Sequence, residues 1–119
     1  MRRVLVVDDD KAFARSIRRV LRQRYAVECA HGVPAALVAL RDGRALAAVW
    51  SDRQLPEPTG GVTVLCAAAA QHPEAVLVMV TGAPDAEGIR ALPPSARVFA
   101  KADTQEALDW LMARLSPVV

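Results

Sequence analysis

Four short runs of apolar residues, mostly β-branched or small, divide this chain, and polar residues follow each run within two positions. The runs cover residues 4–7, 47–50, 76–80 and 98–100, and the polar residues after them are Asp8, Asp9 and Asp10, then Asp52, Thr81 and Lys101. Runs of this length are typical of strands that are buried on both faces, as in a parallel sheet. The carboxyl ends of parallel strands lie along one edge of an open sheet, where ligands bind. We therefore expect carboxylates, a hydroxyl and an ammonium group from distant parts of the chain to meet at one edge.

Strand-like and helix-like segments alternate along the whole chain. Strands are predicted at about 3–8, 26–30, 46–52, 75–81 and 96–100, and helices at about 11–24, 33–42, 62–72, 85–92 and 104–115. These five strand–helix units predict one α/β domain over residues 1–119, with a doubly wound five-stranded parallel sheet and helices on both faces. At 119 residues the chain is long enough to bury a core without a disulfide or a structural metal.

The first predicted helix has a clear apolar spacing. Phe13, Ile17, Val20 and Leu21 recur at helical intervals, which predicts that they form its buried face. Asp10 stands just before this helix, where its side chain can accept hydrogen bonds from the free amides of the first turn. The last helix has a similar spacing at Leu108, Leu111, Met112 and Leu115.

Cysteine usage and hydropathy limit the class of protein. Cys29 and Cys66 lie far apart and form neither a C-x-x-C pair nor a metal-spaced pattern, so we expect two buried thiols in a reducing compartment. No apolar run reaches the length of a membrane span, and the first strand begins close to Met1. Both observations favour a cytoplasmic domain that does not enter a membrane.

The net charge is only +2, but five arginines are clustered in one segment. That segment contains Arg15, Arg18, Arg19, Arg22 and Arg24. Nucleic-acid-binding modules combine such residues with aromatic stacking partners or a recognisable motif, whereas this chain has only two Trp, one Tyr and two Phe. We therefore expect no direct nucleic-acid binding. The arginines form either a solvated helix face or a surface for a protein partner.

The acidic residues at the predicted sheet edge indicate a bound cation and phosphoryl chemistry. Two carboxylates about 5 Å apart repel by roughly 3 kcal/mol at an effective dielectric constant of about 20, so Asp8, Asp9 and Asp52 need compensating charge. Lys101 can neutralise one of them. Mg²⁺ suits the others, because the ligands would be oxygens and no Cys or His pair is available. Asp52 is then the candidate nucleophile, since a carboxylate can attack phosphorus and form an aspartyl phosphate, while positive charge and the Thr81 hydroxyl stabilise the transferred group.

This set of residues resembles the receiver domain of two-component response regulators, a flavodoxin-like fold, over nearly the whole chain. Asp8 and Asp9 resemble the acidic pair that ends the first strand of that family, and Asp52 resembles its phosphoacceptor. Thr81 resembles the switch hydroxyl, and Lys101 resembles the lysine at the end of the fifth strand. The loop and small residues that accompany these positions also resemble the pattern: Leu55, Pro56, Gly60 and Gly82.

The resemblance implies a signalling domain that accepts a phosphoryl group. By this resemblance, Asp9, Asp52 and the main-chain carbonyl of Gln54 would ligate Mg²⁺, with Asp8 acting through water. The donor would be a phosphohistidine on a histidine kinase or a histidine phosphotransfer domain. The residues at Gln54 and Ala83 would tune the loss of the phosphoryl group to water. The signal would pass to an unknown downstream protein or a fused output domain. Such a domain catalyses only its own phosphorylation and dephosphorylation, so we do not expect an enzyme with a separate substrate.

Several positions depart from the family's pattern on the output side. Val98 stands where the family often has Tyr or Phe, and Phe99 should point to the opposite face because side chains alternate along a strand. Ala102 replaces the proline that usually follows the lysine. A cis bond before a residue other than proline costs about 2.5–4 kcal/mol, so we predict a trans bond between Lys101 and Ala102.

Two other functions remain open from the sequence. The departures at Val98 and Ala102, together with Arg53 beside the candidate nucleophile, are compatible with a pseudo-receiver that binds proteins without being phosphorylated. A phosphohydrolase that forms an aspartyl phosphate is the third possibility. Those enzymes commonly use an acid two residues after the nucleophile, and Gln54 occupies that position here.

Overall fold

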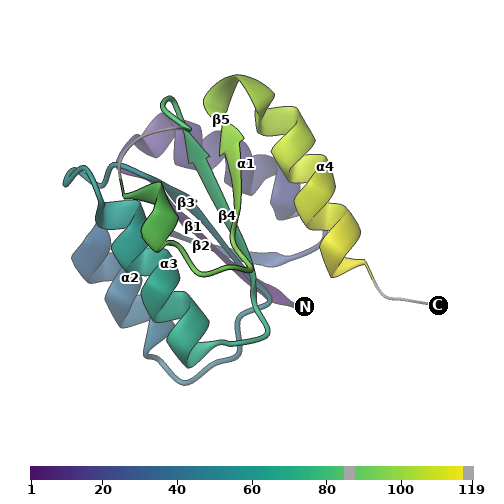
Figure 1. The fold of residues 1–119 in the computed structure, drawn as a ribbon. Helices are drawn as coiled ribbons and strands as arrows, with labels where there is room; N and C mark the ends of the chain where they lie inside the picture. The colour runs from purple at the N-terminus through teal and green to yellow at the C-terminus, as the bar shows by residue number, and fades with distance from the viewer. Residues whose placement is uncertain (85–87, 117–119) are drawn as a thin grey trace.

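Five parallel strands form the centre of the molecule. In the computed structural model, which describes residues 1–84 and 88–116, the strands are β1 (Arg3–Val7), β2 (Ala26–Ala30), β3 (Ala48–Asp52), β4 (Val76–Thr81) and β5 (Arg97–Ala100). Their order across the sheet is β2-β1-β3-β4-β5, and every neighbouring pair is parallel (Figure 1). The predicted doubly wound five-stranded parallel sheet is therefore confirmed.

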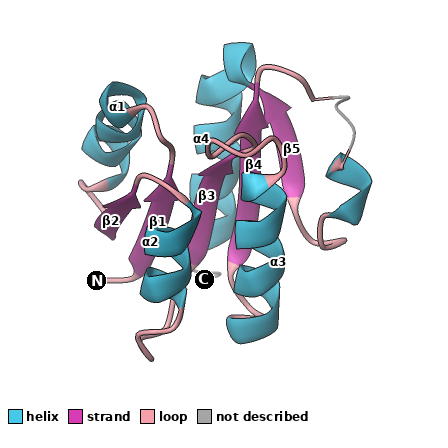
Figure 2. Ribbon diagram, turned by 90° about the vertical axis from the view of Figure 1, so that its left-hand side faces the viewer, coloured by secondary structure: helices cyan, strands magenta, loops and turns pink. Residues whose placement is uncertain are grey.

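Helices cover both faces of the sheet. They are α1 (Lys11–Leu21), α2 (Val33–Leu40), α3 (Gly60–Gln71) and α4 (Thr104–Leu115). Helices α1 and α4 lie on one face, and α2 and α3 lie on the other (Figures 1 and 2). Among residues 1–84 and 88–116, no helix is both long and apolar enough to cross a membrane.

The sheet separates two apolar clusters. Side chains alternate along each strand, so Leu5 and Val49 pack under α2 and α3, while Val6 and Trp50 pack under α1 and α4. In β5 the same alternation places Val98 against the first cluster and Phe99 in the second, as the sequence predicted. Every residue of β1 and β3 is buried, which accounts for the apolar runs at residues 4–7 and 48–50 within them.

Helix α1 begins and packs largely as its sequence predicts. The Asp10 side chain accepts hydrogen bonds from the amides of Ala12 and Phe13 at 3.0 and 3.1 Å, so the predicted cap is confirmed. Ile17 and Leu21 are buried, but Val20 is 37% exposed, and its predicted place in the core is wrong. The helix turns by about 100° per residue, which places position 20 at the side of a face centred on positions 14, 17 and 21.

Three other predictions differ from the structure. The first helix ends at Leu21, three residues earlier than expected. Of the helix predicted at 85–92, residues 85–87 lie outside the described part of the chain, and the remainder contains a 3-10 helix at Ile89–Ala91. The two thiols are not buried: Cys29 is partly exposed and Cys66 is exposed. Cys66 is an exposed residue of α3, and its Sγ donates to the Ala91 carbonyl at 3.3 Å.

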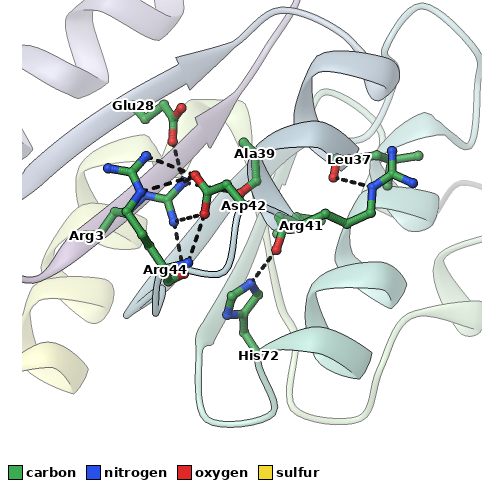
Figure 3. Close-up of polar contacts among 9 residues, drawn as sticks. Arg3, Glu28, Leu37, Ala39, Arg41, Asp42, Arg44 and His72 are labelled. Carbon is green, nitrogen blue, oxygen red and sulfur yellow. Dashed lines mark hydrogen bonds and ion pairs between the residues drawn. The ribbon is translucent and has the colours of Figure 1, made fainter.

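A buried arginine ties the amino-terminal end of the sheet to the turn after α2. The Arg3 side chain is 9% exposed, and its Nη2 lies 2.7 Å from Glu28 Oε1 and 2.7 Å from Asp42 Oδ2 (Figure 3). Arg3 also donates to the carbonyl oxygens of Ala39 and Arg44 at 3.2 and 3.0 Å. Because this guanidinium has both charge and hydrogen-bond partners, it fixes β1, β2 and the turn before β3 relative to one another.

Arg3→Leu is expected to lower the free energy of unfolding by about 2 kcal/mol, because two carboxylates lose their shared cation and two carbonyls lose a donor. Urea unfolding monitored by circular dichroism measures this change. Arg44→Ala is the matched control: Arg44 also pairs with Asp42, but its side chain is 67% exposed, so little change is expected. Equal effects of the two substitutions would show that the Arg3 contacts are no stronger than an exposed ion pair.

Candidate functional site

Three carboxylates meet at the carboxyl end of the sheet. Asp8 and Asp9 follow β1, and Asp52 is the last residue of β3, the strand beside it. One carboxylate oxygen from each residue lies within 4.8 Å of the other two. Asp8 and Asp52 are buried, at 1% and 8% exposure, and Asp9 is exposed. The three acids that the sequence singled out therefore form one cluster that opens to solvent on the Asp9 side.

Asp52 has a cationic neighbour and a main-chain donor. Lys101, which follows β5, places its Nζ 3.6 Å from Asp52 Oδ2 and also lies over the Phe13 ring, 5.2 Å from its centroid. The amide of Arg53 donates to Asp52 Oδ1 at 2.8 Å. The peptide bond between Lys101 and Ala102 is trans, as predicted. One carboxylate oxygen of Asp52 thus faces a cation, and the other accepts from a main-chain amide.

Burial makes the ionised forms of Asp8 and Asp52 unfavourable in the absence of a bound cation. Desolvation raises the pKa of Asp8 to about 6, with a smaller contribution from the negative charge of Asp52, although the Asp10 amide opposes the rise. Burial also raises the pKa of Asp52, while the ammonium of Lys101 and the Arg53 amide act in the opposite direction. A cation bound among these groups would favour their ionised forms.

The donor atoms fit a hard divalent cation. Asp8 Oδ1 accepts from the Asp10 amide at 2.9 Å, whereas Asp8 Oδ2 is buried and has no hydrogen-bond partner among the described residues. A buried carboxylate oxygen without a partner is costly, and a metal ion or its bound water would satisfy it. The cluster offers oxygen atoms alone, which suits Mg²⁺. Gln54 lies two residues after Asp52 with an exposed side chain, and its carbonyl as a fourth ligand stays a prediction.

Thr81 completes the group of residues predicted from the sequence. It ends β4, the strand next to β3, and is 2% exposed. Its Oγ1 accepts from the Ala83 amide at 3.0 Å and from Arg53 Nε at 3.3 Å. The sequence indicated Arg53 only as an unusual neighbour of Asp52. Its contact with Thr81 depends on the path of a long side chain, which no residue spacing reveals.

Gly61 allows α3 to begin directly against the end of β3. A Cβ atom at this position would lie 2.0 Å from the Asp52 carbonyl oxygen and 2.7 Å from the Arg53 Cα. The Gly61 amide donates to the Arg53 carbonyl at 2.7 Å, which closes the loop between β3 and α3. The loop is held further by a bridge between Leu55, which is fully buried, and Glu57. These contacts fix the main chain that follows Asp52.

Asp8→Asn is expected to stabilise the metal-free protein at neutral and basic pH. A carboxyl group whose pKa is raised on folding contributes most stability when protonated, below its unfolded pKa of 3.8, and this contribution is lost as the pH rises through about 6. The loss corresponds to about 3 kcal/mol at most, and water near the exposed Asp9 reduces it to about 2 kcal/mol.

Urea unfolding in the presence of EDTA measures this effect. The two proteins should be nearly equal in stability at about pH 4, and Asp8→Asn should be more stable at pH 8. Asp10→Asn is a suitable control, because asparagine also caps helices well. A constant difference between wild type and Asp8→Asn across the whole pH range would contradict the assignment to Asp8.

Solved structures resemble this chain over most of its length, although no protein-family model and no curated protein matches the sequence. The signal receiver domain of an HD domain-containing protein from Pseudomonas fluorescens Pf-5 superposes with a TM-score of 0.78 and 26% identity, over 96% of this chain and 86% of that one. A response regulator receiver protein from Sinorhizobium medicae gives a TM-score of 0.79 at 19% identity, over 97% of each chain.

A third structure has a modified aspartate. It is a response regulator protein from Burkholderia pseudomallei with a phosphorylated aspartic acid, a calcium ion and citrate. It matches with a TM-score of 0.73 and 24% identity, over all of this chain and 77% of that one. The matches agree on one architecture, the fold on which the acidic cluster of this chain is built.

Proposed function

We propose that this chain, which has the fold of response regulator receiver domains, accepts a phosphoryl group on Asp52 and thereby switches a protein-interaction surface. The donor is a phosphohistidine on a histidine kinase or a histidine phosphotransfer domain. Residues 1–119 act as one receiver domain in the cytoplasm, where a kinase has access to ATP. The target is a downstream protein or an output domain in the same polypeptide. Beyond its own phosphorylation and dephosphorylation, the domain is not an enzyme.

The observation that carries this proposal is the unsatisfied acidic cluster beside a lysine. One carboxylate oxygen from each of Asp8, Asp9 and Asp52 lies within 4.8 Å of the other two. In the part of the chain that the structure describes, the buried Asp8 Oδ2 has no hydrogen-bond partner. A domain with a purely structural role gains nothing from this arrangement, because each buried carboxylate costs stability. A site for Mg²⁺, held by Asp8, Asp9, Asp52 and the Gln54 carbonyl, explains why these acids are gathered at one edge.

The chemistry is a displacement at phosphorus. A carboxylate oxygen of Asp52 attacks, the new O–P bond forms, and the N–P bond of the phosphohistidine breaks as the imidazole leaves with the bonding electrons. Bound Mg²⁺ would neutralise charge on the phosphoryl oxygens. Lys101 supplies a second positive charge, and Thr81 supplies a hydroxyl donor. The signal ends when the aspartyl phosphate is hydrolysed: water attacks the phosphorus, which restores the Asp52 carboxylate and releases inorganic phosphate.

One specific observation favours the second function, a pseudo-receiver that binds proteins without phosphorylation. Arg53, an unusual neighbour of the nucleophile, donates to the Thr81 hydroxyl at 3.3 Å, so a bulky cationic side chain already lies beside the hydroxyl that a phosphoryl group on Asp52 would contact. Val98, which replaces the usual aromatic residue, is compatible with the same idea. The acidic cluster weighs against it, because a pseudo-receiver has no need to retain three carboxylates and a lysine together.

Acetyl phosphate distinguishes the two functions. The purified chain is incubated with acetyl phosphate and Mg²⁺, and its intact mass is measured with and without subsequent hydroxylamine, which cleaves acyl phosphates. The proposal predicts one added phosphoryl group that requires Mg²⁺ and is removed by hydroxylamine. A chain that takes up no phosphoryl group, and that binds no beryllofluoride in the presence of Mg²⁺, would be a pseudo-receiver.

A further inference from the structure

We propose that Arg53 is a positioning residue for Thr81: its guanidinium holds the threonine hydroxyl so that the hydroxyl proton remains free for the phosphoryl group on Asp52. This inference rests on the proposed function. Arg53 follows the nucleophile Asp52 directly, but this position alone gives its side chain no role. Adjacent side chains at the end of a strand point in different directions. The contacts of Arg53 give it a role.

The main chain of Arg53 is fixed from both sides. Its amide donates to Asp52 Oδ1 at 2.8 Å, and its carbonyl accepts from the Gly61 amide at 2.7 Å. Gly61 approaches so closely that a Cβ on it would lie 2.7 Å from the Arg53 Cα. The side chain of Arg53 therefore starts from a backbone that cannot shift without moving Asp52 or α3.

The side chain is held at two further points. Nη1 donates to the Pro58 carbonyl at 2.8 Å, and Nε donates to Thr81 Oγ1 at 3.3 Å. The first contact anchors the guanidinium on the loop between β3 and α3, and the second extends it to the end of β4. A planar guanidinium can make both contacts because its donors point in fixed and different directions. A single ammonium group has no such geometry.

The contact with Arg53 orients the Thr81 hydroxyl, because a hydroxyl group has a limited number of donor and acceptor positions. A hydroxyl group accepts two hydrogen bonds and donates one. Both acceptor positions of Thr81 Oγ1 are filled, one by the Ala83 amide at 3.0 Å and one by Arg53 Nε. Among the described residues, no hydrogen bond has this hydroxyl as its donor, so its proton is left for a ligand. Donation from a cationic group also polarises the hydroxyl and makes it a better donor.

A double-mutant cycle tests the coupling between the two side chains. The affinity for beryllofluoride, a phosphoryl mimic, is measured by calorimetry in the presence of Mg²⁺ for wild type, Arg53→Ala, Thr81→Ala and the double variant. Arg53→Ala should weaken binding by about tenfold when Thr81 is present, and by much less when Thr81 is already alanine. Equal weakening in both backgrounds, or no weakening, would overturn the inference.

The variant Arg53→Lys distinguishes the effect of the guanidinium's hydrogen-bond geometry from the effect of its positive charge. It keeps the positive charge but not the two divergent donors, so it should lose most of the coupling with Thr81. Full wild-type affinity in Arg53→Lys would mean that charge alone matters, which would also overturn the inference. Circular dichroism and thermal unfolding show whether each variant retains its fold.

A measurement without metal or mimic gives an independent readout. Because the Ala83 amide donates to the same hydroxyl, its proton chemical shift in metal-free protein should move in Arg53→Ala and in Arg53→Lys alike, while amides of β1 remain unchanged. If the wild type binds no beryllofluoride, the proposed function has failed and the inference fails with it. If the wild type binds and the cycle shows no coupling, only the role of Arg53 is lost.

Discussion

Replacing Asp52 with asparagine is expected to abolish phosphoryl transfer to this chain, with no label from acetyl phosphate above background. Asparagine keeps the shape of the side chain and can still accept from the Arg53 amide, but its amide does not form an acyl phosphate. The variant should remain folded. Burial raises the pKa of Asp52, which means that its charged form is unfavourable in the folded protein, so a neutral side chain is expected to preserve or increase stability.

Asp103→Asn is the matched control. Asp103 precedes α4, is exposed, and makes no side-chain hydrogen bond to the helix, so its loss of charge should leave labelling unchanged. Intact mass spectrometry after incubation with acetyl phosphate and Mg²⁺ compares the three proteins. If Asp52→Asn were labelled as fully as wild type, a different residue would be the acceptor, and the proposed role of Asp52 would be falsified.

Gly61→Ala is expected to lower the free energy of unfolding by about 3 kcal/mol or more. The added Cβ would lie 2.0 Å from the Asp52 carbonyl oxygen and 2.9 Å from that of Arg53. Both contacts are with main-chain atoms, which cannot turn away as a side chain can. The start of α3 must then move from β3, which also displaces the residue proposed to accept the phosphoryl group. Urea unfolding measures the loss of stability, and acetyl phosphate labelling measures the effect on the site.

Gly82→Ala is the appropriate stability control. It lies in the loop that follows Thr81, and a Cβ on it would meet no atom within 4 Å. Its φ is not in the left-handed region, so alanine should be neutral, or slightly stabilising because it restricts the unfolded chain. Similar destabilisation by the two substitutions would indicate that the close approach at Gly61 is not what limits α3.

The sheet and its functional edge follow from patterns that the sequence displays directly. Strands buried on both faces are largely apolar, and the polar residues that follow their apolar runs lie at the carboxyl edge of the sheet. For this reason the cluster of Asp8, Asp9 and Asp52 was predictable although the residues are far apart in the chain. Alternation along β5 likewise gave the opposite directions of Val98 and Phe99.

Other features depend on geometry that the sequence does not encode locally. Val20 has helical spacing but lies at the side of the buried face, because the width of that face depends on the neighbouring elements. Cys66 was expected to be buried because it belongs to no disulfide or metal pattern, yet a residue of an apolar helix can face solvent. Buried Arg3 was not predicted, since its partners come from two segments that are distant in sequence, β2 and residues 39–44. The contact between Arg53 and Thr81 was missed for the same reason.

Because the sheet divides the apolar interior into two clusters, the effect of a core substitution should depend on the side of the sheet on which it lies. A void opened beneath α2 and α3 cannot be refilled by side chains from the other side, because a continuous layer of main chain lies between them. Val49 and Trp50 are adjacent in sequence, but shortening one should loosen a different pair of helices from those loosened by shortening the other. Paired substitutions across this partition should therefore add, whereas paired substitutions within one compartment should not.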